Sequence, residues 1–269
     1  MKWWTGKWAH LAWVLTGPWP NDRICVIWTG ANQTQHATVL GNQVEVVESF
    51  TYLGYLIHCS GSNEPEIKRR ANIVREAMFS VDQNIWRSSI TLETKLRLYN
   101  TCILPIFLYG AETWSVTVVL SRTIDALDNW CLRHILNVHW SEFVTNDEIR
   151  SRTGQPFLSD TVSSRHLSFI GHLYRADPGQ DHHRALQAGI AVPPDNWRRR
   201  IGRPRQSWLR IVEADLQPVN LGLATAKRRA QDRSAWRKLV ATATSSQTRS
   251  WRRRRRTYYV SFLLIYLLT

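Results

Sequence analysis

Residues 92–114, LETKLRLYNTCILPIFLYGAETW, are the stretch around which the rest of the chain is organised. Apolar residues recur in it at steps of four, three and four, which predicts one apolar stripe on a helix. The stripe consists of Leu92, Leu96, Tyr99 and Ile103. Thr91 precedes the stripe and is predicted to be the N-cap. Pro105 lacks a backbone donor, so we expect the helix to kink or end there.

Similar patterns flank this stretch on both sides. Apolar residues at helical spacing predict helices over 64–86, 92–109 and 121–138. Ahead of them, apolar residues between Val44 and Ile57 predict short strands that form a hairpin. Behind them, residues 145–148 (TNDE) form a capping box, and the short helix that it begins should stop at Gly154. Ser159 is expected to cap a further helix that runs to Arg175.

The last third of the chain changes composition. Residues 176–206 are rich in Pro, Gly and Arg and have no apolar period, which is typical of a linker. Ser207 should open a short helix that ends before Pro218, and residues 224–243 should form a last helix. We therefore expect a basic helical module over 207–245.

The positive charge is unevenly distributed. The chain has 269 residues and a net charge of +14. Eighteen Lys and Arg stand against three acids between Trp197 and Arg256, whereas the remaining residues hold seventeen bases and eighteen acids. Such a basic block is typical of a chain with a polyanionic partner, most often nucleic acid. A solvated basic tail is the alternative.

The four cysteines give no sign of a disulfide framework or a zinc site. They are widely spaced, without a C-x-x-C pair, so we expect a reducing, intracellular compartment, either nuclear or cytoplasmic. Cys131, His134 and His139 match a loose C-x2-H-x4-H pattern, but Cys131 fits the apolar face of a helix. We therefore expect no metal and no cofactor.

Both ends of the chain are predicted to be irregular. Residues 1–43 contain six tryptophans without a period of 3.6 or 2.0, and we interpret them as an N-terminal addition. Residues 246–269 hold a run of five arginines (252–256) and an apolar tail of eleven residues (258–268). The tail has about half the length that spans a bilayer. It is either an interfacial anchor or, as we favour, a non-native readthrough tail, so a membrane is not expected as a partner.

An ordered series of short motifs runs through the middle of the chain. The series consists of residues 50–54 (FTYLG), a basic amphipathic segment, residues 94–101 (TKLRLYNT), residues 104–114 (LPIFLYGAETW), residues 131–133 (CLR), residues 153–156 (TGQP), residues 171–172 (GH), residues 202–205 (GRPR) and residues 231–236 (QDRSAW). From about Val44 to about Ala243 this series resembles the C-terminal third of a reverse transcriptase from a non-LTR (LINE-like) retrotransposon.

The resemblance implies a fold and a role for each part. The hairpin corresponds to the primer grip, which holds the primer end, and the helices behind it correspond to the polymerase thumb. Without the resemblance, the same hairpin pattern is typical of an ordinary two-stranded ribbon. We therefore expect a mainly α protein with a hairpin and a helical thumb-like domain over 44–175, the linker and the basic helical module.

The predicted partner is RNA, DNA or their hybrid, with no small-molecule substrate. The predicted binding residues come from the hairpin, the basic helix faces and the Arg-rich linker. They are Tyr52, Leu53, Gly54, Lys68, Arg69, Arg70, Lys95, Arg198, Arg199, Arg200, Gly202, Arg203, Pro204, Arg205, Trp208, Lys227, Arg228 and Arg229. Trp208 and Trp236 could stack on bases, but packing in the core is the simpler interpretation of both.

Catalysis is not expected from these residues. A reverse transcriptase needs carboxylates on neighbouring strands to hold two metal ions. In the family these lie on a Tyr-x-Asp-Asp hairpin and an earlier strand, both upstream of the F-x-Y-L-G motif. Only 49 residues precede Phe50 here, and the chain contains no Asp-Asp pair. The family's endonuclease domain lies further upstream still, so we expect neither activity and no catalytic residue.

Residues 198–205 (RRRIGRPR) leave two interpretations open. Their G-R-P core matches an AT-hook, in which arginines enter the narrow minor groove of A·T-rich DNA. A disordered basic linker that contacts any polyanion fits the pattern as well. A domesticated minor-groove module is thus the second functional hypothesis, and a non-functional pseudogene product is the third.

Overall fold

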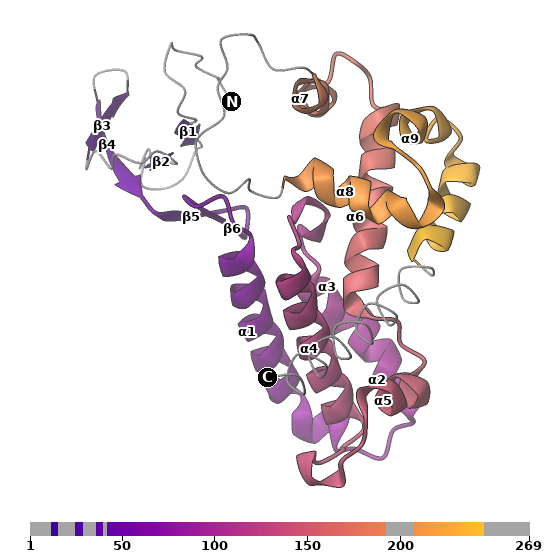
Figure 1. Cartoon of the computed structure of the whole chain (residues 1–269). Helices are drawn as coiled ribbons and strands as arrows, with labels where there is room; N and C mark the ends of the chain where they lie inside the picture. The colour runs from indigo at the N-terminus through magenta and orange to yellow at the C-terminus, as the bar shows by residue number, and fades with distance from the viewer. Residues whose placement is uncertain (1–11, 16–24, 29–35, 40–41, 192–206, 245–269) are drawn as a thin grey trace, which may run out of the picture. The chain divides into compact units, whose positions relative to one another are not determined.

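The computed structural model describes residues 12–15, 25–28, 36–39, 42–191 and 207–244 (Figure 1). The chain divides into two compact units, residues 1–74 and 75–269. The division falls inside helix α1 (Glu64–Ser80), whereas composition suggested boundaries near 43 and 175. The described residues are mainly helical with one short two-stranded hairpin, so the predicted fold class is confirmed.

The first unit contains more strands than expected. It has a four-stranded sheet in the order β1-β2-β4-β3, in which β2 and β4 pair in parallel and the other pairs are antiparallel. The strands are β1 (Ala12–Leu15), β2 (Cys25–Trp28), β3 (His36–Val39) and β4 (Asn42–Val47). The prediction of an irregular segment over 1–43 is therefore wrong for β1 to β3. Each has only four residues, too few for a period, yet β-branched and aromatic residues favour a strand.

The predicted hairpin is confirmed. It pairs β5 (Ser49–Tyr52) with β6 (Tyr55–His58) in antiparallel register, and Tyr52 lies opposite Tyr55. Leu53 and Gly54 form its two-residue turn with φ of 47° and 75°. Both central residues of such a turn need a positive φ, which Gly adopts without strain and Leu does not. A leucine held in this conformation marks the tip of the hairpin.

The second unit is entirely helical in its described part. After α1 it contains ordinary helices, π-helical turns (η1 and η2) and short 3-10 turns (η3 to η5). They are η1 (Asp82–Trp86), α2 (Leu92–Leu98), η2 (Tyr99–Ile103), α3 (Leu104–Phe107), η3 (Ala111–Thr113), α4 (Val118–Ile135), η4 (Trp140–Glu142), α5 (Asn146–Thr153), α6 (Leu158–Arg175), α7 (Asp181–Ile190), α8 (Trp208–Leu216), η5 (Gln217–Val219), α9 (Leu223–Arg229) and a last helix over 233–244.

The predicted cap and apolar stripe of the central stretch are confirmed, whereas the helical backbone does not end at Pro105 but continues to Phe107. The Thr91 side chain caps α2 by accepting a hydrogen bond from the Thr94 N–H. The helix then widens into η2 directly before Pro105, which lies in the first turn of α3. The wider turn accommodates the proline, because no α-helical hydrogen bond is required from its nitrogen. Tyr99 and Ile103 are buried, as the apolar stripe requires.

Of two further predicted helix boundaries, one is confirmed and one is wrong, and the predicted linker is wrong over part of its length. Thr145 and Gly154 bound α5 as predicted, with Gly154 at φ 65°. Ser159 is not a cap, because its hydroxyl and N–H bind the Asp125 carboxylate and α6 begins at Leu158. The linker prediction for 176–206 is wrong over 181–190, which form α7. Leu186 is the buried apolar residue of α7. One such residue gives no helical period in the sequence, which is why this helix was not predicted.

The predicted last helix is divided in two. The Asp232 carboxylate accepts hydrogen bonds from the N–H groups of Ser234 and Ala235, so it caps a new helix over 233–244. These hydrogen bonds lower the pKa of Asp232 below its ordinary value. α9 therefore ends at Arg229 instead of continuing to Ala243. The break allows the two helices to pack on different parts of α6.

A buried polar network joins α4 and α5. The Arg150 guanidinium pairs with Asp128 and donates to the Asn129 side chain, and the Tyr99 hydroxyl donates to Asp128. Burial raises the pKa of Asp128, and the charge of Arg150 opposes that rise. Ion pairs buried in this way fix one arrangement of the helices, because losing one partner leaves a buried charge.

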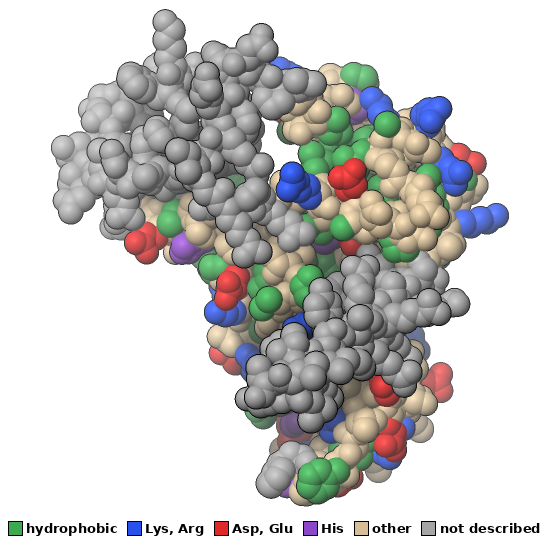
Figure 2. Space-filling model, viewed as in Figure 1, with side chains coloured by type: hydrophobic (Ala, Val, Ile, Leu, Met, Phe, Trp, Pro, Cys, Tyr) green, Lys and Arg blue, Asp and Glu red, His purple; other side chains and the backbone are tan. Residues whose placement is uncertain are grey.

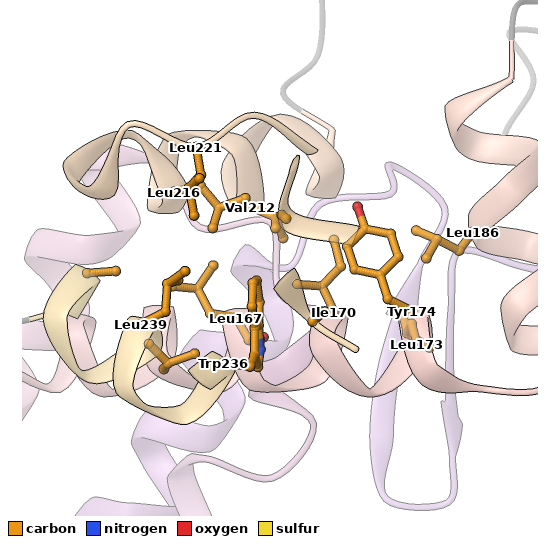
Figure 3. Close-up of a cluster of buried hydrophobic side chains, with 14 residues drawn as sticks. Leu167, Ile170, Leu173, Tyr174, Leu186, Val212, Leu216, Leu221, Trp236 and Leu239 are labelled. Carbon is orange, nitrogen blue, oxygen red and sulfur yellow. The ribbon is translucent and has the colours of Figure 1, made fainter. Parts of the chain in front are cut away.

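A separate core holds the C-terminal helices against α6. Figure 3 shows Leu167, Ile170 and Tyr174 of α6 facing apolar residues of α8 and of the helix 233–244. Trp236 is 3% exposed, and its indole N–H donates to the Leu167 carbonyl over 2.9 Å. A Cβ at Gly171 would lie 2.1 Å from the indole nitrogen, so only glycine fits there. The predicted module over 207–245 thus shares its core with α6.

Candidate nucleic-acid interface

The hairpin tip carries three of the predicted binding residues, Tyr52, Leu53 and Gly54. Leu53 is 63% exposed, a large fraction for an aliphatic side chain. The Gly54 carbonyl accepts hydrogen bonds from both Arg69 and Arg70 of α1. The tip is therefore fastened to α1 through its backbone, and Leu53 presents an apolar side chain to the solvent.

A buried carboxylate, Glu66, pairs with two of the predicted binding arginines. Its oxygens accept hydrogen bonds of 2.8 Å from Nε of Arg69 and of Arg70, and one of 3.0 Å from the Leu56 N–H. The Glu66 side chain is fully buried. Burial alone would raise its pKa, but these hydrogen bonds lower it below the ordinary value. Arg69 and Arg70 thus hold the hairpin on α1, and they share the Glu66 carboxylate as their ion-pair partner.

Three further predicted residues also have partners inside the protein. Lys68 pairs with Glu64 at 2.8 Å on the surface of α1. Lys95 donates from Nζ to the Trp86 carbonyl over 2.7 Å. Trp208 donates from its indole nitrogen to the Glu112 carbonyl over 2.9 Å, and its ring packs edge-on against Phe169. Packing, the simpler interpretation of Trp208, is what the structure shows.

The basic residues of α9 differ from those of α1. Lys227, Arg228 and Arg229 are all exposed. Among the residues that the structure describes, no acidic side chain forms an ion pair with them. Ala226 of α9 and Ala230, its C-cap, are fully buried, so the helix is docked with its basic side chains outward. Figure 2 shows Lys and Arg side chains along the edge where α9 and the helix 233–244 lie.

A groove of about 490 Å³ lies between α6 and the helix 233–244. Its polar lining comes from two elements and contains no acidic side chain: Ser164, Ser168, His172 and Arg175 from α6, and Arg233 and Arg237 from the last helix. None of the α6 residues is among the predicted binding residues. Their spacing of four, four and three residues is the signal that one helix face carries them all.

Arg175 links this groove to the end of α9. Its Nη1 donates to the Ala230 carbonyl over 2.7 Å. Burial lowers the pKa of Arg175, and the nearby positive charge of Arg233 lowers it further. The groove thus brings like charges together without an acid among its lining residues, an arrangement that an anion would stabilise.

A second groove, of about 570 Å³, lies at the end of α4, where Trp130 stacks on His134. Its cationic side chains have internal partners. Arg87 binds Asp82 and Asn137, and Arg133 donates to the Val144 carbonyl and to Asn146. His134 contacts Asp82 at 2.7 Å. The groove beside α6 is therefore the stronger candidate for an anion.

The remaining predicted residues lie outside the described part of the chain. They are Arg198, Arg199, Arg200, Gly202, Arg203, Pro204 and Arg205. The structure accordingly does not test the AT-hook interpretation. Within the described ranges, none of the helices has the length and apolar composition of a membrane span.

Fold and surface together define a mainly helical chain with a basic C-terminal module. The chain is 25% identical over 172 residues to a transposon-derived protein of Caenorhabditis elegans. The match covers 62% of this chain and 59% of that protein, so the chain spans less than two thirds of its relative. No family model matches the chain, and no solved structure matches it. The similarity indicates a transposable-element origin.

Proposed function

We propose that this chain derives from the C-terminal part of a retrotransposon reverse transcriptase and binds nucleic acid without catalysing a reaction itself. The transposon-derived relative supports the origin. The order of the elements supports the finer assignment, because a hairpin, then helices, then basic helices follow the order of primer grip, thumb and C-terminal region. The partner is RNA, DNA or their hybrid.

One observation carries the binding proposal. Lys227, Arg228 and Arg229 project from a helix that is docked on the core, and no described acid pairs with them. Cations that are not paired with an acid gain binding free energy when they neutralise phosphates, because counterions are released from the nucleic acid. Cations on a docked helix also lose less backbone freedom on binding than cations on a flexible tail.

The test is the affinity of the full chain for three nucleic acids at several salt concentrations. Fluorescence anisotropy would compare a primer–template RNA–DNA hybrid, an A·T-rich duplex and a single-stranded RNA. We expect the logarithm of the binding constant to fall linearly with the logarithm of salt. A preference for the hybrid supports the thumb-like role, and the absence of binding to all three contradicts the proposal.

Two further results would separate the alternatives. A preference for A·T-rich over G·C-rich duplex that Arg203→Ala abolishes would favour the minor-groove module. Equal affinity for both duplexes would count against it. Metal-dependent primer extension by the purified chain would contradict the absence of catalysis.

A further inference from the structure

We propose that the groove between α6 and the helix 233–244 holds a backbone phosphate of a nucleic-acid strand. The inference rests on the proposed nucleic-acid binding and names a site for it. The site combines Arg175 and two serines of α6 with Arg233 and Arg237 of the last helix.

The packing of Trp236 explains why the two helices bring these side chains together. Its indole N–H is bound to the Leu167 carbonyl, and the ring fills the space that Gly171 leaves open. Arg233 and Arg237 lie three residues before and one residue after Trp236, four residues apart. Residues at this spacing share one helix face. Docking of the tryptophan therefore places both arginines along α6.

The charges of the groove favour an anion over a neutral ligand. Arg175, Arg233 and Arg237 line one recess of about 490 Å³, and no acid lines it. Asp232 lies next to Arg233 in sequence, but its carboxylate is engaged by the Ser234 and Ala235 N–H groups. Charge-assisted hydrogen bonds from arginine to phosphate are among the strong ones. The hydroxyls of Ser164 and Ser168 can donate to the remaining phosphate oxygens.

The lining also predicts what the groove does not recognise. Trp236 is almost fully buried, so its ring is not a platform for a base. The polar groups are cations, hydroxyls and one imidazole, which bind phosphate and sugar without reading sequence. We therefore expect contacts at this site to be sensitive to salt and indifferent to base composition.

The experiment uses the double variant Arg233→Gln/Arg237→Gln in the full chain. A matched control, Arg97→Gln/Arg122→Gln, removes two exposed arginines from α2 and α4. Each phosphate contact to a single strand contributes about 0.7 to the salt slope. The slope for single-stranded RNA should fall by about 1.4 in the groove variant and by less than about 0.5 in the control. Near-ultraviolet circular dichroism would verify that Trp236 remains packed.

A second measurement separates this inference from the proposed function. Inorganic phosphate should raise the melting temperature of the wild-type chain and of the control, but not of the groove variant. If the wild-type chain binds RNA and both double variants lose the same slope, the groove assignment is overturned and the proposed function stands. If phosphate stabilises only chains with an intact groove but no nucleic acid binds, the groove is an anion site and the proposed function fails.

Discussion

The sequence Lys-Arg-Arg occurs on α1 (residues 68–70) and again on α9 (residues 227–229), with opposite outcomes. On α1 Lys68 pairs with Glu64, Arg69 and Arg70 share Glu66, and both arginines donate to the Gly54 carbonyl. On α9 all three are exposed, and no described acid pairs with them. The difference lies in the preceding turn, which reads Glu-Pro-Glu-Ile on α1 and Leu-Ala-Thr-Ala on α9.

We infer from the comparison that a basic helix face is open to a polyanion where the neighbouring turn lacks acids. Residues three and four positions apart on a helix are neighbours, so Glu66 reaches both Arg69 and Arg70. A count of basic residues treats the two tripeptides alike. The acids one turn earlier show that the first set stabilises the fold and that the second is available to a partner.

The largest effect is expected when the buried acid of α1 is removed. Glu66→Gln leaves Arg70, whose side chain is 10% exposed, without its counter-charge. Losing one partner of a buried pair costs roughly 3–5 kcal/mol, so the hairpin should separate from α1. Hydrogen exchange of the Leu56 amide, which donates to Glu66, is the direct measurement.

Glu64→Gln is the matched control for that variant, because it breaks the exposed pair with Lys68. Such a surface pair contributes less than about 1 kcal/mol. Equal changes in the exchange of the Leu56 amide in the two variants would show that Glu66 does not hold the hairpin. The contrast between the basic residues of α1 and α9 would then lose its α1 side.

The next effect concerns the cations of α9. Replacing Lys227, Arg228 and Arg229 together by Gln should lower the salt slope for duplex DNA by about 2–3, since each lost phosphate contact contributes about 0.9. Lys68→Gln should leave the slope within about 0.5 of the wild-type value. An unchanged slope in the triple variant would place nucleic-acid binding elsewhere in the chain.

A smaller change should make α9 resemble α1. Ala224 is exposed and lies three and four residues before Lys227 and Arg228. Ala224→Glu places an acid at the same spacing from two cations that Glu66 has from Arg69 and Arg70 on α1, and it removes no cation, so the salt slope should fall by about 1. Ala224→Gln, the uncharged control, should keep the wild-type slope. A salt slope in Ala224→Glu equal to the wild-type slope would mean that a neighbouring acid does not decide whether these cations contact nucleic acid.

The smallest effect is expected from mild changes of pH. The folded-state pKa of Glu66 lies below its ordinary value of 4.5. Its contribution to stability is therefore fully present above about pH 4.5 and is lost as pH falls through the lower folded-state pKa. Protection of the Leu56 amide should stay constant from pH 7 to 5 and fall in more acid solution. Protection that declines already between pH 7 and 5 would contradict this assignment.

Local signals in the sequence predicted the helical fold well. Thr91, Thr145 and Ser207 cap helices as expected, because an N-cap depends only on the next three residues. The hairpin was predictable for the same reason, since its turn and its strands are contiguous. The missing donor of Pro105 predicted a kink or an end of the helix, whereas the structure shows a π-helical turn and a helix that continues.

The misses depend on contacts between distant segments. Ser159 has the right chemistry for a cap, but Asp125 lies close enough to take its hydrogen bonds. One miss is local by contrast: Asp232 divides the last helix by capping the N–H groups of Ser234 and Ala235, a signal that the continuous apolar pattern outweighed. The roles of Arg69 and Arg70 depend on the position of the Gly54 carbonyl. None of these distances is visible in a linear pattern.

Arginine footprinting of the wild-type chain, with and without an RNA–DNA hybrid, tests the central claim most directly. A reagent specific for guanidinium groups, read by mass spectrometry, reports both basic tripeptides in one sample. We predict that Arg228 and Arg229 react rapidly in the free protein and are protected by the hybrid, whereas Arg69 and Arg70 react slowly in both samples. Protection of Arg69 and Arg70 with no change at Arg228 and Arg229 would contradict the account.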